Sequence, residues 1–188
     1  MSQDEYFSVH AHLKINVEIL SHDEHVPSNV EFEREIPISF RIASACSNLD
    51  SNIENELNAL HHDNSQALSK CLHAQSEKIN LLLGFMLAQQ DDPKLRHQTE
   101  TFGASSLTFI TKTSFKKGQH IRLKLFLEHP HSAIYCYASA YSCEERNGKH
   151  AVGAKYIRLQ DNDRDVLIRA ALHQQQKLLR QRTLERDS

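Results

Sequence analysis

Hydroxyl and histidine side chains, the groups that serve as nucleophiles and bases, gather near residues 97–106 of this 188-residue chain. Ser105 and Ser106 follow His97 closely enough to suggest part of a serine nucleophile with its base. A nucleophilic serine of this kind normally sits on a sharp turn between a strand and a helix, and no such pattern surrounds Ser105. Serine in a loop more often shapes a turn, so the chain is predicted not to be an enzyme.

Histidine pairs at two places could each present two imidazole rings on one face of a strand. These pairs are His10 with His12 and His129 with His131. A zinc site needs a third or fourth ligand nearby, and the sequence indicates none, so no metal site is predicted. The four cysteines form no Cys-x-x-Cys pair and are interpreted as small buried apolar residues. A disulfide or a zinc site is the alternative interpretation of the cysteines.

The composition is typical of a globular protein and argues against several other classes. Hydrophobic residues make up 39% and charged residues 24% of the chain. The most apolar stretch, residues 79–87, is shorter than the roughly 20 residues that a helix needs to cross a bilayer, so no membrane insertion is expected. Residues 1–5 lack the basic and apolar regions of a signal peptide, so a cytoplasmic location is expected. The net charge of -2 argues against nucleic-acid binding.

Two segments near the N-terminus alternate apolar and polar residues, the pattern of a strand with one buried face. From Phe7 to Ile19 every odd position is apolar. A strand of that length would span roughly 40 Å, so we expect a bend or different partners at its two ends. From Val30 to Ile42 most even positions are apolar, and Pro37 favours an edge strand or a break. Residues 1–44 are therefore assigned to an N-terminal β segment.

Between residues 45 and 92 the period changes to that of a helix, and one stripe follows a heptad repeat. The stripe consists of Leu68, Leu72, Gln75, Ile79, Leu82 and Met86. One interpretation is a single helix, roughly 65 Å long, that forms a coiled coil with other copies of the chain. The other is two shorter helices folded into a hairpin that breaks near residues 61–64. The first interpretation is preferred, with Gln75 helping to set register and oligomer number.

Short strands separated by turns follow in residues 93–160, a pattern typical of a small antiparallel barrel. The expected strands are Leu107 to Thr111, Ile121 to Leu127, Ala133 to Cys143 and Ala151 to Leu159. Asn147 and Gly148 favour a type I′ hairpin turn between the last two strands. A helix with a basic end follows from Asp161. The predicted fold class is α+β: a small antiparallel β-barrel with a long heptad-bearing helix and a C-terminal helix.

The order of elements in residues 93–188 resembles the PilZ domain, a small antiparallel barrel followed by a helix. Residues 101–109 resemble the signature turn of that family and the strand after it, and residues 118–127 resemble the next strand. Residues 151–157 are similar to the last barrel strand, and residues 163–169 to the start of the terminal helix. The resemblance depends on the order and spacing of these segments together. It implies the fold of a family in which many members are receptors for cyclic di-GMP.

Ligand-binding PilZ domains carry two arginines just before the barrel and the sequence Asp/Asn-x-Ser-x-x-Gly at the turn. The arginines pair with phosphate and stack on guanine, the polar side chains bond the base, and the glycine permits close backbone approach. Here Thr101, Gly103 and Ser106 occupy the three turn positions, and all three differ from the family pattern. Arg96 is accompanied by Lys94 at the wrong spacing. Cyclic di-GMP binding in the usual mode is therefore not expected, and no cofactor is predicted.

Arg34 and Arg41 lie elsewhere in the sequence and could join Arg96 at the turn in three dimensions. The resemblance implies a non-enzymatic signalling adaptor of the cyclic di-GMP pathway, and a receptor that uses this non-standard arginine cluster is the alternative. A heptad helix attached to a PilZ-like barrel resembles an oligomeric branch of the family. Self-association as a dimer or tetramer and an unidentified protein partner are therefore expected. Motility, adhesion and biofilm control are the processes that the family suggests.

Overall fold

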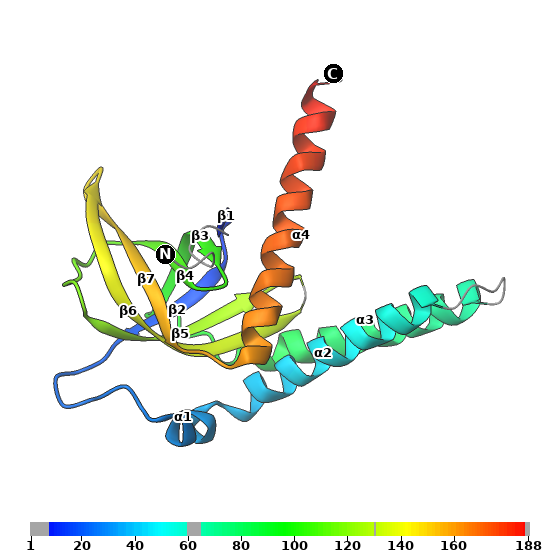
Figure 1. Ribbon diagram of the computed structural model, residues 1–188, viewed down its shortest axis with the longest axis horizontal. Coiled ribbons are helices and arrows are strands. Elements are labelled where there is room, and N and C mark those ends of the chain that lie inside the picture. Colours follow the sequence, from blue (N-terminus) through cyan, green and yellow to red (C-terminus); the bar gives the residue numbers. More distant parts are fainter. Residues whose placement is uncertain (1–7, 60–64, 130, 187–188) are drawn as a thin grey trace.

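The computed structural model describes residues 8–59, 65–129 and 131–186, which form seven strands and four helices. Figure 1 shows a barrel, a pair of helices that extends away from it, and one long helix that leaves the barrel in another direction. The strands are β1 (Ser8–His10), β2 (Lys14–Ile19), β3 (Arg96–Gly103), β4 (Ser106–Thr111), β5 (His120–Leu127), β6 (Ser132–Arg146) and β7 (Lys149–Arg158). The helices are α1 (Asn29–Glu35), α2 (Ile38–Ala59), α3 (Ser65–Ala88) and α4 (Asp161–Arg186).

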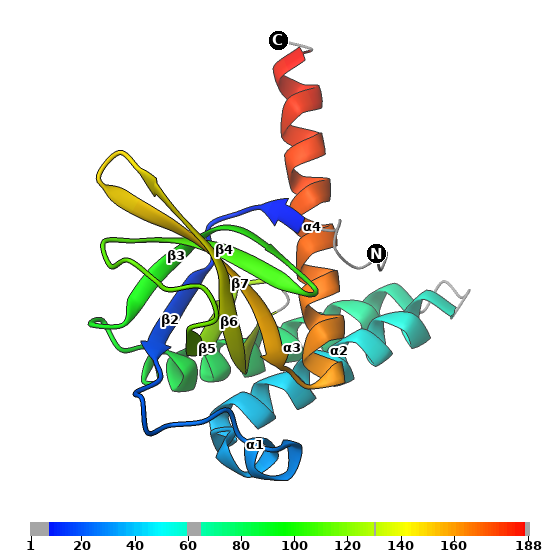
Figure 2. The ribbon, with the colours of Figure 1, turned by 60° about the vertical axis from the view of Figure 1, so that its left-hand side comes forward.

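Six of these strands close into an antiparallel barrel. Their order around the barrel is β3, β2, β5, β6, β7 and β4, and β4 pairs again with β3. The predicted alternation is confirmed on β5, where Ile121, Leu123 and Leu125 are completely buried. They share one core with Val166 and Leu167, so the first turns of α4 pack onto the barrel (Figure 2). The predicted α+β fold class with an antiparallel barrel and a C-terminal helix is therefore confirmed.

The N-terminal alternating segment forms two strands with different partners at its two ends, as expected. β1 pairs with the end of β3, whereas β2 lies between the start of β3 and β5. At the bend, the Thr99 hydroxyl accepts the Leu13 N–H at 2.8 Å and donates to the Ala11 carbonyl at 2.6 Å. Backbone groups that leave the ladder therefore stay bonded. The N-terminal strands complete the barrel, which is not confined to residues 93–188; Phe7 lies outside the described residues.

The strand predicted for residues 30–42 is wrong, and the N-terminal β segment does not extend to residue 44, because α1 and the start of α2 occupy this stretch. Phe32, Ile36 and Phe40 are buried, whereas the other apolar residues of the alternating set, Val30, Ile38 and Ile42, are exposed. When apolar residues occupy every second position, every other one of them is four residues from the next. A spacing of four also places residues on one face of a helix. Ser28 and Glu31 form a capping box at the start of α1, a helix signal that the alternation concealed.

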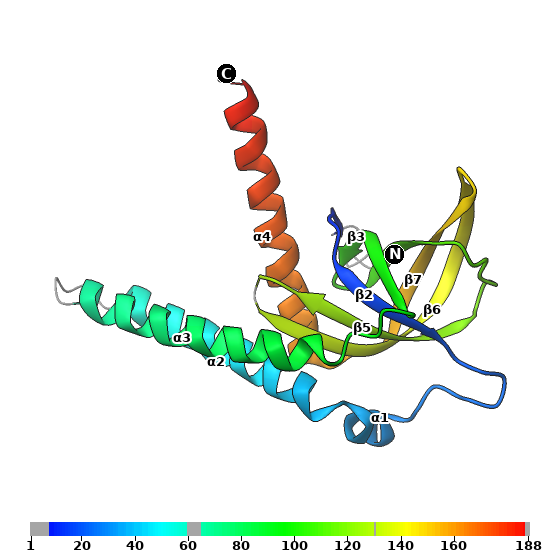
Figure 3. The ribbon, with the colours of Figure 1, turned by 180° about the vertical axis from the view of Figure 1, so that it is seen from behind.

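Two helices occupy residues 45–92, where a single long helix was preferred from the sequence. α2 begins at Ile38 and runs outward, and α3 returns beside it (Figure 3). The Ser76 hydroxyl of α3 donates to the Asp50 carboxylate of α2 at 3.0 Å. Each helix covers one side of the other, which supplies the packing that a lone exposed helix lacks. The hairpin alternative is therefore correct; the predicted break at residues 61–64 lies outside the described residues.

A buried hydrogen bond ties α4 to α2 at the root of the hairpin. The Ser44 hydroxyl donates to the Asp163 carboxylate at 2.8 Å, and Asp163 is 3% exposed. Burial raises the pKa of Asp163 to about 6, and the bond from Ser44 opposes the rise. An aspartic acid in an unfolded chain has a pKa of about 3.9, so between these two values the folded protein binds the proton more tightly than the unfolded chain does.

Asp163→Asn is expected to flatten the pH dependence of stability. For Asp163, the free energy of unfolding is highest below about pH 4 and falls by roughly 2–3 kcal/mol as the pH rises through about 6. Asparagine keeps an acceptor for Ser44 and has no charge, so the variant is more stable than the parent at neutral pH. Urea unfolding at about pH 4.5 and about pH 7.5 measures this difference. Asp165→Asn, an exposed change in the same helix, is the control; matching profiles for parent and Asp163→Asn would contradict the assignment.

Candidate functional site

The turn that resembles a nucleotide-binding signature lies between β3 and β4. Thr101 of β3 is partly exposed, whereas Gly103 ends the strand, pairs with Ser8 and is buried. Ser106 begins β4 and pairs with the exposed Lys155 of β7. Thr101 and Ser106 thus each bring a hydroxyl group to the turn. Gly103 has no side chain to bond a base, so the turn offers little of the directional bonding that recognition of guanine requires.

An arginine reaches this turn from α4, and it binds the backbone. The Arg164 guanidinium donates to the Ala104 carbonyl at 2.7 Å, and the Tyr156 N–H donates to the Ser105 carbonyl at 3.0 Å. These two bonds hold the turn against α4 and β7. A guanidinium engaged in this way has fewer donors for a bidentate contact with phosphate. Sequence reasoning missed Arg164, which lies far from the turn in the chain and is recognised through the fold alone.

Arg96 lies at the opposite end of β3 from the turn, seven residues before Gly103 and therefore roughly 20 Å away along an extended strand. Its guanidinium lies 2.8 Å from the Asp91 carboxylate, which also accepts a bond from Asn16 at 2.9 Å and lies 3.5 Å from Lys14. Burial opposes the charge of Asp91, but the bonds from Arg96 and Asn16 outweigh it and lower the pKa. Arg96 thus belongs to an ion pair at the base of the barrel.

Arg34 and Arg41 lie on the opposite side of the barrel from the turn. Arg34 is in α1 and Arg41 is in the first turn of α2, and both side chains are exposed. Both helices pack on β6, which is three strands from β3 whichever way the barrel is followed. The structure therefore brings none of Arg34, Arg41 and Arg96 together at Thr101. The six residues of the predicted ligand site divide into three separate places.

The pairing of a serine with His97 does not form either. His97 lies at the start of β3, where Nδ1 contacts the Leu95 carbonyl at 2.8 Å and Nε2 contacts the Thr111 hydroxyl at 3.2 Å. Ser105 and Ser106 lie beyond the far end of that strand. A base must be within hydrogen-bond reach of the proton that it removes, so these residues do not make a nucleophile and base.

Neither a metal site nor a disulfide is found among the described residues. No group of three or more histidine, cysteine or acidic side chains in residues 8–59, 65–129 and 131–186 could hold a metal ion. All four cysteines are free. The interpretation of the cysteines as buried apolar residues is correct for Cys136 and wrong for Cys71, which is exposed. Cys46 and Cys143 are half-buried.

The predicted heptad stripe of α3 faces outward for most of its length within one copy of the chain. Its exposed members are Leu68, Gln75, Ile79 and Leu82, and its half-buried members are Leu72 and Met86. Of the α3 side chains that the structure describes, Leu83 and Leu87 are buried in the protein. The neighbouring Leu81 and Phe85 are not in the stripe and are exposed as well. A helix with apolar residues all round normally has partners all round, a signal that the heptad assignment did not use.

Among the described side chains of the hairpin, Leu81, Leu82 and Phe85 form the most exposed apolar patch, here called the α3 patch. Their exposed fractions are 74%, 72% and 71%. Patches of this kind on soluble proteins mark interaction sites. Across the part of the chain that the structure describes, no helix combines the length and the apolar character that crossing a membrane requires.

Comparisons with known proteins place this geometry in a fold family. No family model matches the chain, and no curated protein matches its sequence. A solved structure from Xanthomonas campestris, described as a new tetrameric PilZ domain self-assembled via an unusual helical bundle, superposes with a TM-score of 0.55 at 14% identity, over 93% of this chain and 91% of that one. The chain has a PilZ-like fold. The inhibitor of motility MotI/DgrA from Bacillus subtilis is also similar, with a TM-score of 0.49 at 11% identity over 94% of this chain; this chain spans 53% of that one.

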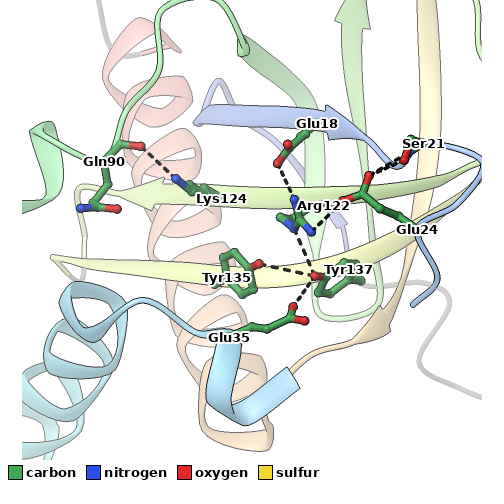
Figure 4. A network of polar contacts seen from close by, with 9 residues as sticks. All are labelled: Glu18, Ser21, Glu24, Glu35, Gln90, Arg122, Lys124, Tyr135 and Tyr137. Carbon is green, nitrogen blue, oxygen red and sulfur yellow. Dashed lines mark hydrogen bonds and ion pairs between the residues drawn. The ribbon is translucent and has the colours of Figure 1, made fainter. Parts of the chain in front are cut away.

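A polar network holds α1 on the outer face of the PilZ-like barrel (Figure 4). Arg122 of β5 donates to Glu18 at 2.9 Å and to the Tyr137 hydroxyl at 3.1 Å, and it lies 3.4 Å from Glu24. Tyr137 in turn donates to Glu35 at the end of α1 at 2.5 Å. Burial opposes the charge of Arg122, but the bonds to Tyr137 and Glu18 raise its pKa. Burial and the bond to Glu35 raise the pKa of Tyr137, so Tyr137 stays protonated and Arg122 charged.

Strands β5 and β6 of the PilZ-like barrel also hold the hairpin where it meets the barrel, at the start of α2 and just after α3. Phe40, at the start of α2, packs against Phe126 and Tyr135 with ring centroids 6.0 and 6.2 Å apart. Just after α3, the Gln90 carbonyl accepts a bond from Lys124 at 3.4 Å, which Figure 4 also shows. Because strands β5 and β6 hold both helix ends, the hairpin projects from the barrel at a defined place.

Proposed function

We propose that this protein is a non-enzymatic signalling adaptor of the cyclic di-GMP pathway. In this proposal it self-associates as a dimer or tetramer through the α2–α3 hairpin, and its β3–β4 turn does not bind cyclic di-GMP in the usual mode. A protein partner then binds the assembled barrels. The α3 patch is the observation on which the proposal rests.

The energetics of the α3 patch favour contact between copies. Burying a leucine or phenylalanine side chain stabilises a protein by about 1.5–3 kcal/mol. Leu81, Leu82 and Phe85 lie within five consecutive residues, so one helix packed against α3 could cover all three. The Xanthomonas campestris protein is described as tetrameric through a helical bundle, and the hairpin offers helices for a bundle of that kind. This likeness supports self-association here.

The geometry of the turn supports the absence of a standard nucleotide site. A cyclic dinucleotide carries two phosphates, and charge-assisted bonds to guanidinium groups are worth about 1.5–3 kcal/mol each. Arg164 donates to the Ala104 carbonyl, and Arg96 is paired with Asp91. A phosphate group that bound either arginine would first have to break these contacts. The proposal therefore assigns signalling to the assembly and its partner.

Titration of cyclic di-GMP is expected to give no binding heat and no change in the thermal midpoint at protein concentrations that detect micromolar affinity. The reason is that the arginines of the predicted cluster lie apart or are already paired. Isothermal titration together with thermal unfolding makes the measurement. Saturable heat that is lost in the double variant Arg34→Ala with Arg41→Ala would establish the receptor alternative. Saturable heat lost in Arg96→Ala would show that the ion pair with Asp91 opens for ligand, and it would also overturn the degenerate-site part of the proposal.

A further inference from the structure

A cavity of about 370 Å³ lies where the hairpin meets the barrel. Residues of α2, α3, the first half of α4 and the connection between β5 and β6 line it. Figure 2 shows α2 and α3 passing beside the start of α4. Small-molecule sites typically have volumes of about 300–1,000 Å³, so the cavity is large enough for a small ligand. It is separate from the β3–β4 turn and from the α3 patch.

Four histidines from distant parts of the chain line this cavity. His129 and His131 come from the connection after β5, His173 from α4 and His73 from α3. The ring centroids of His129 lie 5.4 Å from those of His131 and 5.2 Å from those of His173. No metal-holding group exists among the described residues, so these rings are not arranged as metal ligands. Imidazole rings that hold no metal can each carry a positive charge in the protonated form.

Arg169 supplies a charge in this cavity that does not depend on pH. Its Nη2 donates to the Ser47 hydroxyl at 3.4 Å and to the Asn48 side-chain carbonyl at 3.3 Å, both long contacts to neutral acceptors. Its Nε is buried and has no hydrogen-bond partner. Within the described residues no carboxylate forms an ion pair with Arg169, in contrast to Arg96 and Arg122. These long contacts to neutral groups leave the guanidinium weakly bonded, and an anion in the cavity would make stronger, charge-assisted bonds to it.

Two carboxylates on the hairpin side contribute negative charge to the cavity. Asp50 of α2 accepts the bond from Ser76, and Glu77 lies one turn beyond His73 on α3. With the histidines neutral, the guanidinium of Arg169 and these two carboxylates leave a net charge of about one negative unit. Imidazolium groups at the four histidine positions would reverse the sign, because each adds one positive charge. Among the described residues, the charged and titratable groups that line the cavity are Asp50, His73, Glu77, His129, His131, Arg169 and His173.

We propose that this cavity binds the phosphate or sulfate group of a small ligand, with Arg169 as the principal contact and the histidines strengthening binding as the pH falls. The oxyanion binds the guanidinium of Arg169 in place of the long contacts to Ser47 and Asn48, and imidazolium groups supply further charge-assisted bonds. Because the cavity lies between α2, α3 and α4, a bound anion links the hairpin to the barrel. Binding of an anion in the cavity is therefore coupled to the orientation of the hairpin relative to the barrel.

Sulfate is the first probe, because it stays a dianion throughout the pH range in which histidine titrates. Its effect on the thermal midpoint is compared with that of sodium chloride at equal ionic strength, at about pH 6 and about pH 8. The expected result is saturable stabilisation with higher affinity at the lower pH. Arg169→Gln is expected to weaken the affinity roughly tenfold or more. Arg180→Gln, an exposed change of the same charge on the same helix, should respond as the parent does. General salting-out by sulfate acts on all three proteins equally, so only their difference counts.

A second variant keeps the proposal testable if Arg169→Gln does not fold. His131→Gln combined with His173→Gln leaves Arg169 in place, so sulfate should still bind at about pH 8, and the gain in affinity at about pH 6 should shrink. Ribose 5-phosphate and inorganic phosphate then distinguish the source of the anion: tighter binding of the sugar phosphate indicates a phosphorylated metabolite, and equal binding indicates a free oxyanion. Identical sulfate responses in the parent, Arg169→Gln and the double histidine variant would overturn the proposal. So would stabilisation by zinc ion without any by sulfate.

Discussion

Replacing Leu82 and Phe85 together by lysine is expected to reduce the protein to a monomer of 21.6 kDa. Both side chains belong to the α3 patch, and neither is part of the packing within one copy. Two lysines at a contact between copies would place charges in an apolar interface, and each buried unpaired charge costs several kcal/mol. Size-exclusion chromatography with light scattering measures the mass of parent and variant over a range of concentrations.

The matched control uses the exposed leucines of α4. Leu172 and Leu179 are also solvent-exposed, and the double change of both to lysine alters the charge by the same amount. The mass of this variant should equal that of the parent protein at every concentration. A monomeric α4 variant beside an unchanged α3 variant would place the interface on α4 instead. Leu72 is not chosen, because it is half-buried and lines the cavity, so its replacement would disturb the hairpin itself.

Arg122→Leu is expected to lower the free energy of unfolding by roughly 2–3 kcal/mol. The change removes the bonds to Glu18 and Tyr137 together, and it leaves the buried Tyr137 hydroxyl with one partner fewer. Because Tyr137 also holds Glu35, α1 loosens from the barrel wall before the whole molecule unfolds. Urea unfolding gives the free energy, and hydrogen exchange of the α1 amides reports the local loss.

Arg146→Leu is the matched control for this loss. Arg146 also pairs with two carboxylates, those of Glu100 and Glu144, but it is exposed and makes no contact with α1. Exposed ion pairs contribute about 0–1 kcal/mol, so this variant should stay close to the parent. Similar losses for the two variants would show that the network stabilises the fold no more than a surface ion pair does.

The barrel strands are predictable because their information is local. Each strand presents one face to the core, so period two in the sequence becomes burial in the structure, as on β5. The turn at Asn147 and Gly148 is equally local: its φ angles are 52° and 73°, and a type I′ turn requires positive φ at both positions. The order of these strands and turns was sufficient for the PilZ resemblance.

The segment of α1 shows where a local pattern has two solutions. Phe32, Ile36 and Phe40 suit a strand face and a helix face equally, since a spacing of four belongs to both periods. The aromatic outer face of β6 resolves the ambiguity, because Phe32 lies against Tyr135 and Tyr137 with ring centroids 6.2 and 6.0 Å apart. That surface comes from residues a hundred positions away, and no window of sequence contains both.

By itself the sequence determined the barrel strands other than β3, the C-terminal helix, and the departure of Thr101, Gly103 and Ser106 from the nucleotide-binding pattern. The tertiary structure alone decided that Asp91 pairs with Arg96, that Arg164 reaches the turn, and that α3 folds back on α2. The physical reason is the separation along the chain between the residues that interact. Alternation and turn chemistry act between neighbours in the chain, whereas a site depends on which distant side chains the closed barrel and its helices bring within a few ångströms of one another.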